Sequence, residues 1–221
     1  MPVPGETQQT KRASSDLPVG WVFFRQWLKN PFSIAALSPS SRQLARQMVA
    51  ELPRATERVI ELGGGTGVFT RALLEHGIKA DDLFVLELNE ALFQHLRANF
   101  KDVRIVCGDA RKLSDLAQDA GFLDPGRVDA VISGLGLLPM SRDMQRQILD
   151  SAFATLKPEG RFIQFTYGPK SPVPRDLLVE LGLSVRRGGW ALFNMPPATV
   201  YVYTRNRSHG VHAVRRKGSG S

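Results

Sequence analysis

The sequence predicts an α/β domain whose β-sheet is mostly parallel. Short apolar runs alternate with amphipathic stretches along the chain, an order typical of parallel sheets with helices on their faces. Three successive runs end in a glycine cluster or an acid, as in sheets that bind a ligand at their carboxyl edge. At 221 residues the chain is long enough to bury one such core. We therefore expect a single α/β domain with an extension at each end.

The first strand of the predicted sheet runs into a glycine-rich turn. Residues 59–67 read VIELGGGTG, a β-branched approach followed by a glycine cluster. Glycine adopts a positive φ without steric cost, and its missing Cβ lets a ligand approach the backbone. The helix that follows from Val68 has free N–H groups in its first turn. The turn is therefore predicted to hold a ligand against its alternating glycines, Gly63, Gly65 and Gly67.

The spacing of this turn separates two classes of cofactor. Dinucleotide-binding turns follow the pattern G-x-G-x-x-G/A. Counted from Gly63 the third glycine position falls on Val68, and counted from Gly65 it falls on Thr70. The sequence therefore disfavours a nicotinamide dinucleotide as the ligand.

Acids at the ends of the next strands indicate S-adenosylmethionine instead. The apolar strand over 83–86 ends in Glu87, whose carboxylate can accept hydrogen bonds from both ribose hydroxyls. The strand over 103–107 is followed by Asp109, which can accept from the adenine amino group. Together with the glycine turn, these acids follow the carboxyl edge of a parallel sheet. The predicted cofactor-binding residues are Glu61, Gly63, Gly65, Gly67, Glu87, Asp109, Ala110 and Ser133.

The remaining elements follow in order toward the C-terminus. A fourth strand covers Val128 to Ser133, and Ser141 opens an amphipathic helix that continues to Leu156. A fifth strand runs from 161 to 167, and a short helix covers 177–181. The last two predicted strands, 183–193 and 199–204, form an antiparallel pair.

The N-terminal segment combines basic and aromatic side chains. Residues 1–54 hold seven Lys or Arg against three acids, and the whole chain has a net charge of +8, which favours an anionic partner. Residues 21–31 predict a short helix, with aromatics at Trp21, Phe24 and Trp27 beside Arg25 and Lys29. This composition is typical of a helix lying in a bilayer interface. A helix packed on the domain's own sheet is the alternative interpretation.

Four parts of the chain are predicted. Residues 1–20 are an unstructured start, 21–54 form amphipathic helices that associate with a membrane or close as a lid, 55–205 are the catalytic domain, and 206–221 are an unstructured basic tail. The tail ends in GSGS, interpreted as a cloning remnant. Ser40 or Ser41 would cap the helix before the first strand, and this segment is either a lid or a plain connector.

Two features bear on the cellular compartment. Cys107 is the single cysteine, so no disulfide can form within the chain and a reducing compartment is expected. The polar first 20 residues contain no signal-peptide core, and no apolar stretch reaches the roughly 20 residues of a membrane span.

From Trp21 to about Tyr203 the sequence resembles the bacterial phospholipid N-methyltransferases. The resemblance lies in the segments 24–31, 38–41, 61–67, 132–135 with 138–139, 164–169 and 194–197. Gly136, where a proline is expected, departs from it. The resemblance implies a Rossmann-like, seven-stranded class I methyltransferase fold with an antiparallel last strand. It also implies stepwise conversion of phosphatidylethanolamine to phosphatidylcholine, in the cytoplasm, by a protein attached peripherally to the inner face of the cell membrane.

Methyl transfer to an amine requires positioning more than covalent participation. Tyr167, at the end of the fifth strand, is the first candidate for orienting the amine, and Ser133 the second. Either could instead be an ordinary strand-end or turn residue. Arg25 and Lys29 are candidates for the lipid phosphate, or else solvated surface charges. Trp21, Phe24, Trp27 and Ser40 complete the predicted substrate or membrane set, and no metal or histidine base is expected.

Two other functions remain as alternatives. An rRNA adenine N6-dimethyltransferase shares the fold but carries an Asn-Pro-Pro-aromatic type of element after the fourth strand to hold a flipped base. Here that position reads Ser133-Gly-Leu-Gly136, while Asn194-Met-Pro-Pro197 lies between the last two strands. A membrane-binding module without turnover is disfavoured by the intact acids Glu61, Glu87 and Asp109.

Overall fold

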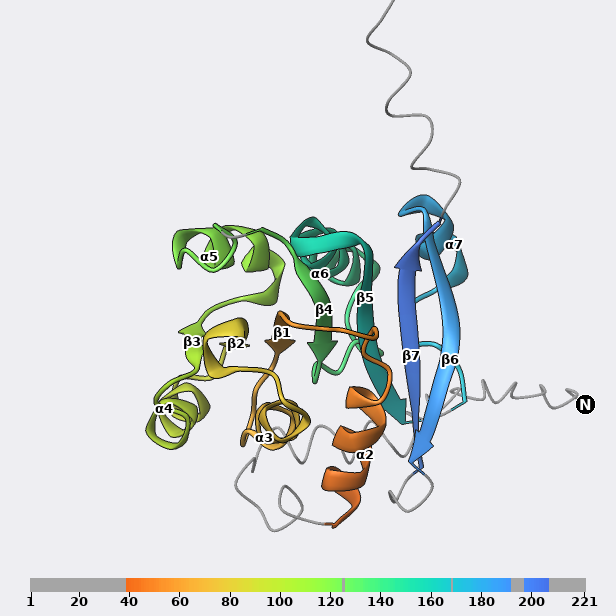
Figure 1. Cartoon of the computed structure of the whole chain (residues 1–221). Helices are drawn as coiled ribbons and strands as arrows, with labels where there is room; N and C mark the ends of the chain where they lie inside the picture. The colour runs from red at the N-terminus through yellow and green to blue at the C-terminus, as the bar shows by residue number, and fades with distance from the viewer. Residues whose placement is uncertain (1–38, 125, 168, 192–196, 207–221) are drawn as a thin grey trace, which may run out of the picture.

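One seven-stranded sheet forms the centre of the protein, seen in a computed structural model that describes residues 39–124, 126–167, 169–191 and 197–206 (Figure 1). The strands lie in the order β3-β2-β1-β4-β5-β7-β6. They are β1 (Val59–Leu62), β2 (Leu83–Glu87), β3 (Arg104–Cys107), β4 (Val128–Ser133), β5 (Leu156–Tyr167), β6 (Leu183–Ala191) and β7 (Ala198–Arg205). The helices are α2 (Pro39–Val49), α3 (Val68–His76), α4 (Glu90–Asn99), α5 (Leu113–Asp119), α6 (Arg142–Thr155) and α7 (Arg175–Glu180), with 3-10 turns at Ala80–Asp82 and Ala110–Lys112.

The direction of the strands confirms the predicted topology. Strands β1 to β5 pair in parallel, and β7 runs antiparallel between β5 and β6. The chain moves outward from β1 through β2 to β3 and then returns to β4 on the other side of β1. Ligands of such sheets bind where the strand order reverses, outside the carboxyl ends. The junction of β1 and β4 therefore sets the position of the site.

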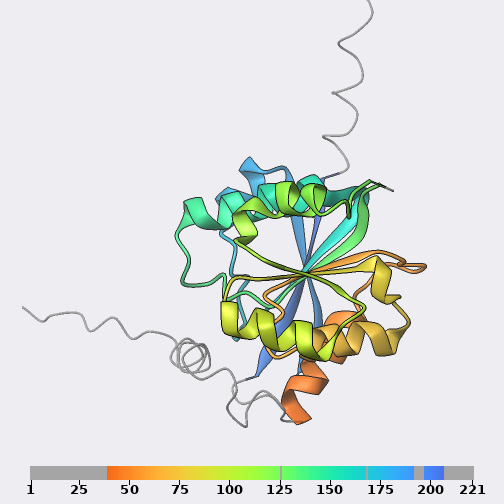
Figure 2. The same cartoon turned by 90° about the vertical axis from the view of Figure 1, so that its left-hand side faces the viewer.

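Helices cover both faces of the sheet in two layers, seen edge-on in Figure 2. One apolar cluster joins the sheet to α2, α3 and α4, and a second joins it to α5, α6 and α7. Alternate strand residues supply the two clusters, because successive side chains of a strand point to opposite faces. Along β1, Ile60 and Leu62 pack in the α6 layer, whereas Val59 packs in the α3 layer. Glu61 alternates with them and thus lies on the α3 face.

Helix α2 is part of the core rather than a separate extension. Its residues Leu44, Ala45, Met48 and Val49 are buried. Just beyond the helix, the Glu51 carboxylate accepts from the Gly189 N–H at 3.0 Å and pairs with Arg186 at 2.7 Å, which fastens the helix to β6. The predicted domain boundary at residue 55 is therefore wrong for α2. Because its apolar face is buried against its own sheet, the connector interpretation is favoured over a lid.

Two further details differ from the prediction. Helix α2 begins at Pro39, so Ser40 and Ser41 lie inside its first turn and neither is the cap. Proline suits that first position, because its missing N–H would have no intrahelical partner. Strand β5 begins at Leu156 instead of 161, since Leu156 pairs with Val128 ahead of an irregularity in the register.

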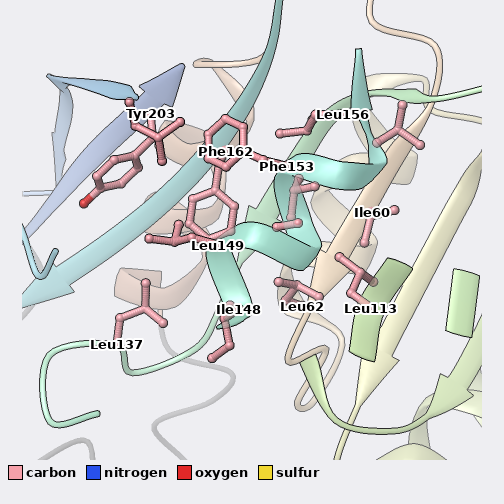
Figure 3. Packing of buried hydrophobic residues seen from close by; sticks show 14 of the residues in the cluster. Ile60, Leu62, Leu113, Leu137, Ile148, Leu149, Phe153, Leu156, Phe162 and Tyr203 are labelled. Atoms are coloured by element: carbon pink, nitrogen blue, oxygen red, sulfur yellow. The ribbon is translucent and has the colours of Figure 1, made fainter. Parts of the chain in front are cut away.

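Aromatic rings fill the α6 layer of the core (Figure 3). The ring of Phe162 lies 5.9 Å from Tyr203 in an edge arrangement and 6.3 Å from Phe153. The Tyr203 hydroxyl hydrogen-bonds Ser171 at 2.8 Å, as a buried phenol requires. Leu137, in the loop between β4 and α6, is buried in the same cluster and anchors that loop at the carboxyl edge.

The described helices are all too short or too polar to cross a bilayer. The predicted segments 1–20, most of 21–54 and nearly all of the tail from 206 lie outside the described residues.

Candidate active site

The glycine turn after β1 has the backbone conformation that the sequence predicts. Gly63, Gly65 and Gly67 adopt φ values of 72°, 55° and 82°, in the left-handed region. Gly67 is the N-cap of α3, so the turn leads directly into the helix. The predicted positive φ of the three alternating glycines is confirmed. Their contact with a ligand stays a prediction, now supported by this geometry.

Gly64 is a fourth required glycine that the sequence reasoning missed. A Cβ at this position would lie 2.5 Å from Val85 Cγ1 and 2.8 Å from Leu96 Cδ1. The turn therefore packs directly on β2 and α4, and only a residue without a side chain fits there. The run of three glycines at 63–65 is the feature of the sequence that could have indicated this requirement. It does not show which residues Gly64 packs against, because Val85 and Leu96 belong to other elements.

Glu61 is a buried carboxyl group with one oxygen unpaired. The Thr70 hydroxyl donates to its Oε2 at 2.6 Å, and Oε1 has no partner among the described residues. Burial raises the pKa of Glu61 to about 8; the Thr70 hydrogen bond opposes this rise and the nearby Glu87 adds to it. The group is therefore largely protonated at neutral pH. An unpaired buried oxygen is costly, which indicates a ligand group that meets it.

Glu87 joins the end of β2 to the glycine turn. Its Oε2 accepts from the Gly65 N–H at 2.9 Å, and its Oε1 accepts from the Asn89 N–H at 2.9 Å. Asn89 in turn caps α4 by accepting from the Leu92 N–H. The carboxylate is thus held at the carboxyl edge, where the sequence predicts a contact with ribose. Leu88, which follows Glu87, is 68% exposed. Its side chain offers an apolar surface to the adenine ring of a cofactor bound at the same edge.

Replacing Glu87 with glutamine should weaken cofactor binding without unfolding the sheet. Both carboxylate oxygens accept from backbone N–H groups and keep lone pairs for the predicted ribose hydroxyls, whereas glutamine has a single acceptor oxygen for the same partners. Hydrogen bonds to charged groups contribute about 1.5–3 kcal/mol, so the dissociation constant should rise roughly 10- to 100-fold. Calorimetric titration with S-adenosylhomocysteine measures this rise. Glu159→Gln, an exposed acid at the opposite edge, should bind as tightly as the unmodified protein.

Asp109 already has partners at the end of β3. It caps the 3-10 turn by accepting from the Arg111 N–H at 2.9 Å, and its other oxygen pairs with the Arg111 guanidinium at 2.5 Å. These contacts with Arg111 hold the pKa of Asp109 below its usual value. Ala110 begins the turn. The predicted contact with adenine therefore stays a prediction, in which Asp109 would share its oxygens between Arg111 and the base.

The loop after β4 is held at the junction with β1 by several hydrogen bonds. The Gly134 N–H donates to Leu62 O at 2.8 Å, and Ser133 Oγ accepts from the Leu135 N–H at 3.3 Å. A Cβ on Gly134 would lie 2.8 Å from Gly63 O, so the two turns lie back to back. Ser133 is fully buried, and its hydroxyl takes part in shaping this loop.

Two buried glutamines, both missed as site residues from the sequence, also hold this loop. Gln164 Nε2 donates to Leu135 O at 2.8 Å, and Gln145 Nε2 donates to Leu137 O at 2.8 Å. Gln164 lies opposite Ser133 in the register of β4 and β5. The Oε1 atom of each glutamine is buried without a described partner. Gln164 opens the segment 164–169 that carries the resemblance, but the role of neither glutamine can be seen in the sequence, because their partners are backbone carbonyls of other segments.

Tyr167 ends β5 on the α3 face of the sheet. Its ring packs edge-on against Phe165, with centroids 5.6 Å apart, and burial raises the pKa of its hydroxyl. Tyr167 and Ser133 thus both lie at the carboxyl edge, on neighbouring strands but on opposite faces of the sheet. Trp21, Phe24, Arg25, Trp27 and Lys29 lie outside the described residues, and Ser40 lies in the first turn of α2.

The described residues fit S-adenosylmethionine in shape and chemistry. The glycines of the turn carry no side chain that would keep a ligand from the backbone, and Glu61 Oε1 has no partner among the described residues. The backbone at Gly63, Gly65 and Gly67 would contact the cofactor. Glu61 would bind a cationic group of the cofactor, and Glu87 would bind its ribose. When bound, the cofactor supplies an electrophilic methyl group on a sulfonium. Within the described ranges no cluster of His, Cys, Asp or Glu side chains could hold a metal ion.

Comparisons with known proteins agree with S-adenosylmethionine as the cofactor. The family model described as "Methyltransferase domain" matches residues 59–160. An ornithine lipid N-methyltransferase from Singulisphaera acidiphila is 32% identical over 153 residues, covering 67% of this chain and 78% of that protein.

Solved structures show the same fold with the cofactor bound. A glycopeptide N-methyltransferase complexed with S-adenosylmethionine superposes with a TM-score of 0.58 at 15% identity, covering 75% of this chain and 94% of that one. Magnesium protoporphyrin IX methyltransferase from Synechocystis, also with bound S-adenosylmethionine, gives 0.55 at 16% identity, covering 75% and 78%. S-adenosylmethionine is the cofactor of this fold, and the chain belongs to the bacterial lipid N-methyltransferase family of class I S-adenosylmethionine-dependent methyltransferases.

Proposed function

We propose that the protein transfers methyl groups from S-adenosylmethionine to the amine of a membrane lipid headgroup. The acceptor is phosphatidylethanolamine, together with its monomethyl and dimethyl intermediates, and the product is phosphatidylcholine. The similarity to an ornithine lipid N-methyltransferase carries this proposal, because that similarity covers most of both chains. The resemblance of the flanking segments to phospholipid N-methyltransferases supports phosphatidylethanolamine in particular.

Ornithine lipid is the second candidate acceptor. The named substrate of the relative favours it directly. Ornithine and ethanolamine headgroups both carry a primary amine, so the same site chemistry serves either acceptor. They differ in the phosphate next to the amine, which only the ethanolamine lipid has, and this difference makes the two candidates separable by experiment.

The ends of β4 and β5, where the acceptor would approach the cofactor, are suited to a neutral amine. The nucleophile must lose its proton before attack, and the described residues at the ends of β4 and β5 supply apolar and aromatic surface. Leu138, in the loop after β4, is 43% exposed beside the buried Leu137. Both histidines of the described chain lie on helices, His76 at the end of α3 and His95 on α4. Tyr167 and Ser133 are the residues that would orient the amine.

The proposed place of reaction is the cytoplasmic face of the membrane. The segment from Trp21 to Lys29 supports peripheral attachment, since it combines aromatic and basic side chains within one short stretch. Each basic residue near an anionic bilayer adds on the order of 1 kcal/mol to binding.

The test uses methyl-labelled S-adenosylmethionine and three separate acceptors. Vesicles of phosphatidylethanolamine, vesicles of ornithine lipid and ribosomal RNA are each incubated with the full chain, and label is measured in each acceptor. We expect label in phosphatidylethanolamine, with protein pelleting alongside anionic vesicles. Label in ornithine lipid alone would replace the first candidate by the second. Label in RNA alone would overturn the proposal, and so would label in none of the three.

A further inference from the structure

Three aromatic rings form a continuous row at the carboxyl edge of the sheet. The Phe69 ring centroid lies 6.0 Å from that of Phe165, and the Phe165 centroid lies 5.6 Å from that of Tyr167. Phe69 is the second residue of α3, and the other two alternate along β5, so all three lie on the α3 face. All three side chains are partly exposed. We refer to Phe69, Phe165 and Tyr167 as the aromatic row.

One end of the aromatic row touches the predicted methyl-donor cradle. Phe69 follows Gly67 by two residues, and a Cβ on Gly134 would lie 3.4 Å from Phe69 Cε2. Phe69 thus lies where the turns after β1 and β4 meet. From there the row extends along β5 toward Tyr167, which pairs with Ala198 of β7 at the end of the sheet. An acceptor nitrogen that reaches the cofactor from the β5 side therefore passes this row.

The ring of Tyr167 is held by a neighbouring ring, and its hydroxyl is open to a ligand or to water. Its ring contacts Phe165, and its hydroxyl makes no hydrogen bond within the described ranges, although burial is enough to raise the pKa of that hydroxyl. Tyrosines buried for core packing usually find such a partner, as Tyr203 does with Ser171. The T-shaped contact of Tyr167 with Phe165 leaves ring faces that are not stacked on each other.

We propose that the aromatic row binds the methylated ammonium group of the acceptor headgroup and so favours acceptors that already carry methyl groups. This inference rests on the proposed function and names the chemistry by which the site recognises its intermediates. A cation over an aromatic face is attracted by the ring quadrupole. Each added methyl replaces an N–H that water would solvate, so the ammonium becomes easier to desolvate against the rings. Dimethylated and trimethylated headgroups should therefore bind more tightly than the unmethylated one.

A purely apolar role for the row predicts a different ligand preference. If the rings only packed against alkyl groups, a neutral headgroup of the same shape would bind equally well. Choline and 3,3-dimethylbutan-1-ol form such a matched pair, because they differ in the charged nitrogen that replaces a carbon. Cation recognition requires choline to bind and the neutral isostere to bind at least several-fold more weakly.

The experiment titrates the full chain, saturated with S-adenosylhomocysteine, with ethanolamine, choline and 3,3-dimethylbutan-1-ol, following binding by NMR. We expect choline to bind best and Phe165→Leu to weaken it roughly tenfold, in line with one desolvated cation–π contact. Tyr167→Leu should have the same effect, which keeps the test valid if Phe165→Leu does not fold. Tyr167→Phe retains the ring and should bind choline almost normally. Phe93→Leu, a ring on α4 beside Arg97, is the matched control and should change nothing.

The outcomes separate this inference from the proposed function. Equal binding of choline and its neutral isostere, binding unaffected by both leucine variants, or no binding of choline would each overturn the aromatic row as an ammonium site. The titration needs no turnover. If choline binds as expected and no lipid becomes labelled, the aromatic row stands and the proposed lipid acceptor fails.

Discussion

Replacing Glu61 with glutamine should stabilise the protein at alkaline pH. The pKa of this carboxyl is raised by burial from 4.5 to about 8 in the folded state. Between these values the folded state holds a proton that the unfolded chain has lost, so stability falls as pH rises from 4.5 to 8. The loss amounts to at most about 5 kcal/mol. Glutamine cannot ionise, so the melting temperature of Glu61→Gln should exceed that of the unmodified protein near pH 9 and match it near pH 5.

The same substitution should weaken cofactor binding. Glu61 Oε1 has no described partner, and a cationic group of the cofactor would both satisfy it and favour its ionised form. Affinity of the unmodified protein should therefore increase as pH approaches 8, since the carboxyl ionises more easily. Affinity of Glu61→Gln should be at least about tenfold lower and independent of pH in this range, because a charge-assisted hydrogen bond is lost. Calorimetric titrations at several pH values measure both features.

A matched control separates this effect from a general response to charge removal. Glu159 is an exposed acid near the amino end of β5, far along the strand from the site. Glu159→Gln should follow the unmodified protein in both melting temperature and cofactor affinity at every pH. If Glu61→Gln melted with the same pH dependence as the unmodified protein, Glu61 would be ionised in the fold and its assigned protonation would be wrong.

The parts of the site that could be predicted from the sequence are those made by local backbone geometry. The alternating glycines must adopt positive φ because the chain turns sharply from β1 into α3, and Gly63, Gly65 and Gly67 do so. Glu87 and Asp109 lie at strand ends, and the ends of parallel strands meet at one edge. Spacing along the chain was therefore enough to place them together.

The parts that could not be predicted depend on contacts between distant segments. Gly64 is required by Val85 and Leu96, and Gln164 acts on the carbonyl of Leu135, 29 residues away. The aromatic row joins α3 to β5 across almost a hundred residues. Single side chains carry no signal of such partners in a sequence, because the tertiary fold brings them together. The packing of α2 on the sheet cannot be predicted for the same reason, since Glu51 just beyond its end is held by β6, more than a hundred residues away.

Replacing Gly67 with alanine should destabilise the protein far more than replacing Gly77. Both glycines have positive φ, 82° and 106°, and they cap opposite ends of α3. Alanine in this region costs about 1–2 kcal/mol at either position. At Gly77 an added Cβ meets nothing within 4 Å, whereas at Gly67 it would overlap the Phe100 ring, with Cζ at 2.7 Å. Overpacking adds about 1–3 kcal/mol, so Gly67→Ala should lose roughly 2–5 kcal/mol in denaturant unfolding.

Two backbone hydrogen bonds explain why this turn cannot shift to relieve the overlap. The Gly67 N–H donates to Gly64 O at 2.9 Å, and Gly67 O accepts from the Arg71 N–H at 3.0 Å, so movement at Gly67 breaks the turn or the first bond of α3. Cofactor affinity should therefore fall in Gly67→Ala and remain normal in Gly77→Ala. Combining Gly67→Ala with Phe100→Leu should recover at least about 1 kcal/mol relative to the sum of the single changes. Strict additivity would assign the loss to backbone strain alone and contradict the packing of Phe100 against the turn.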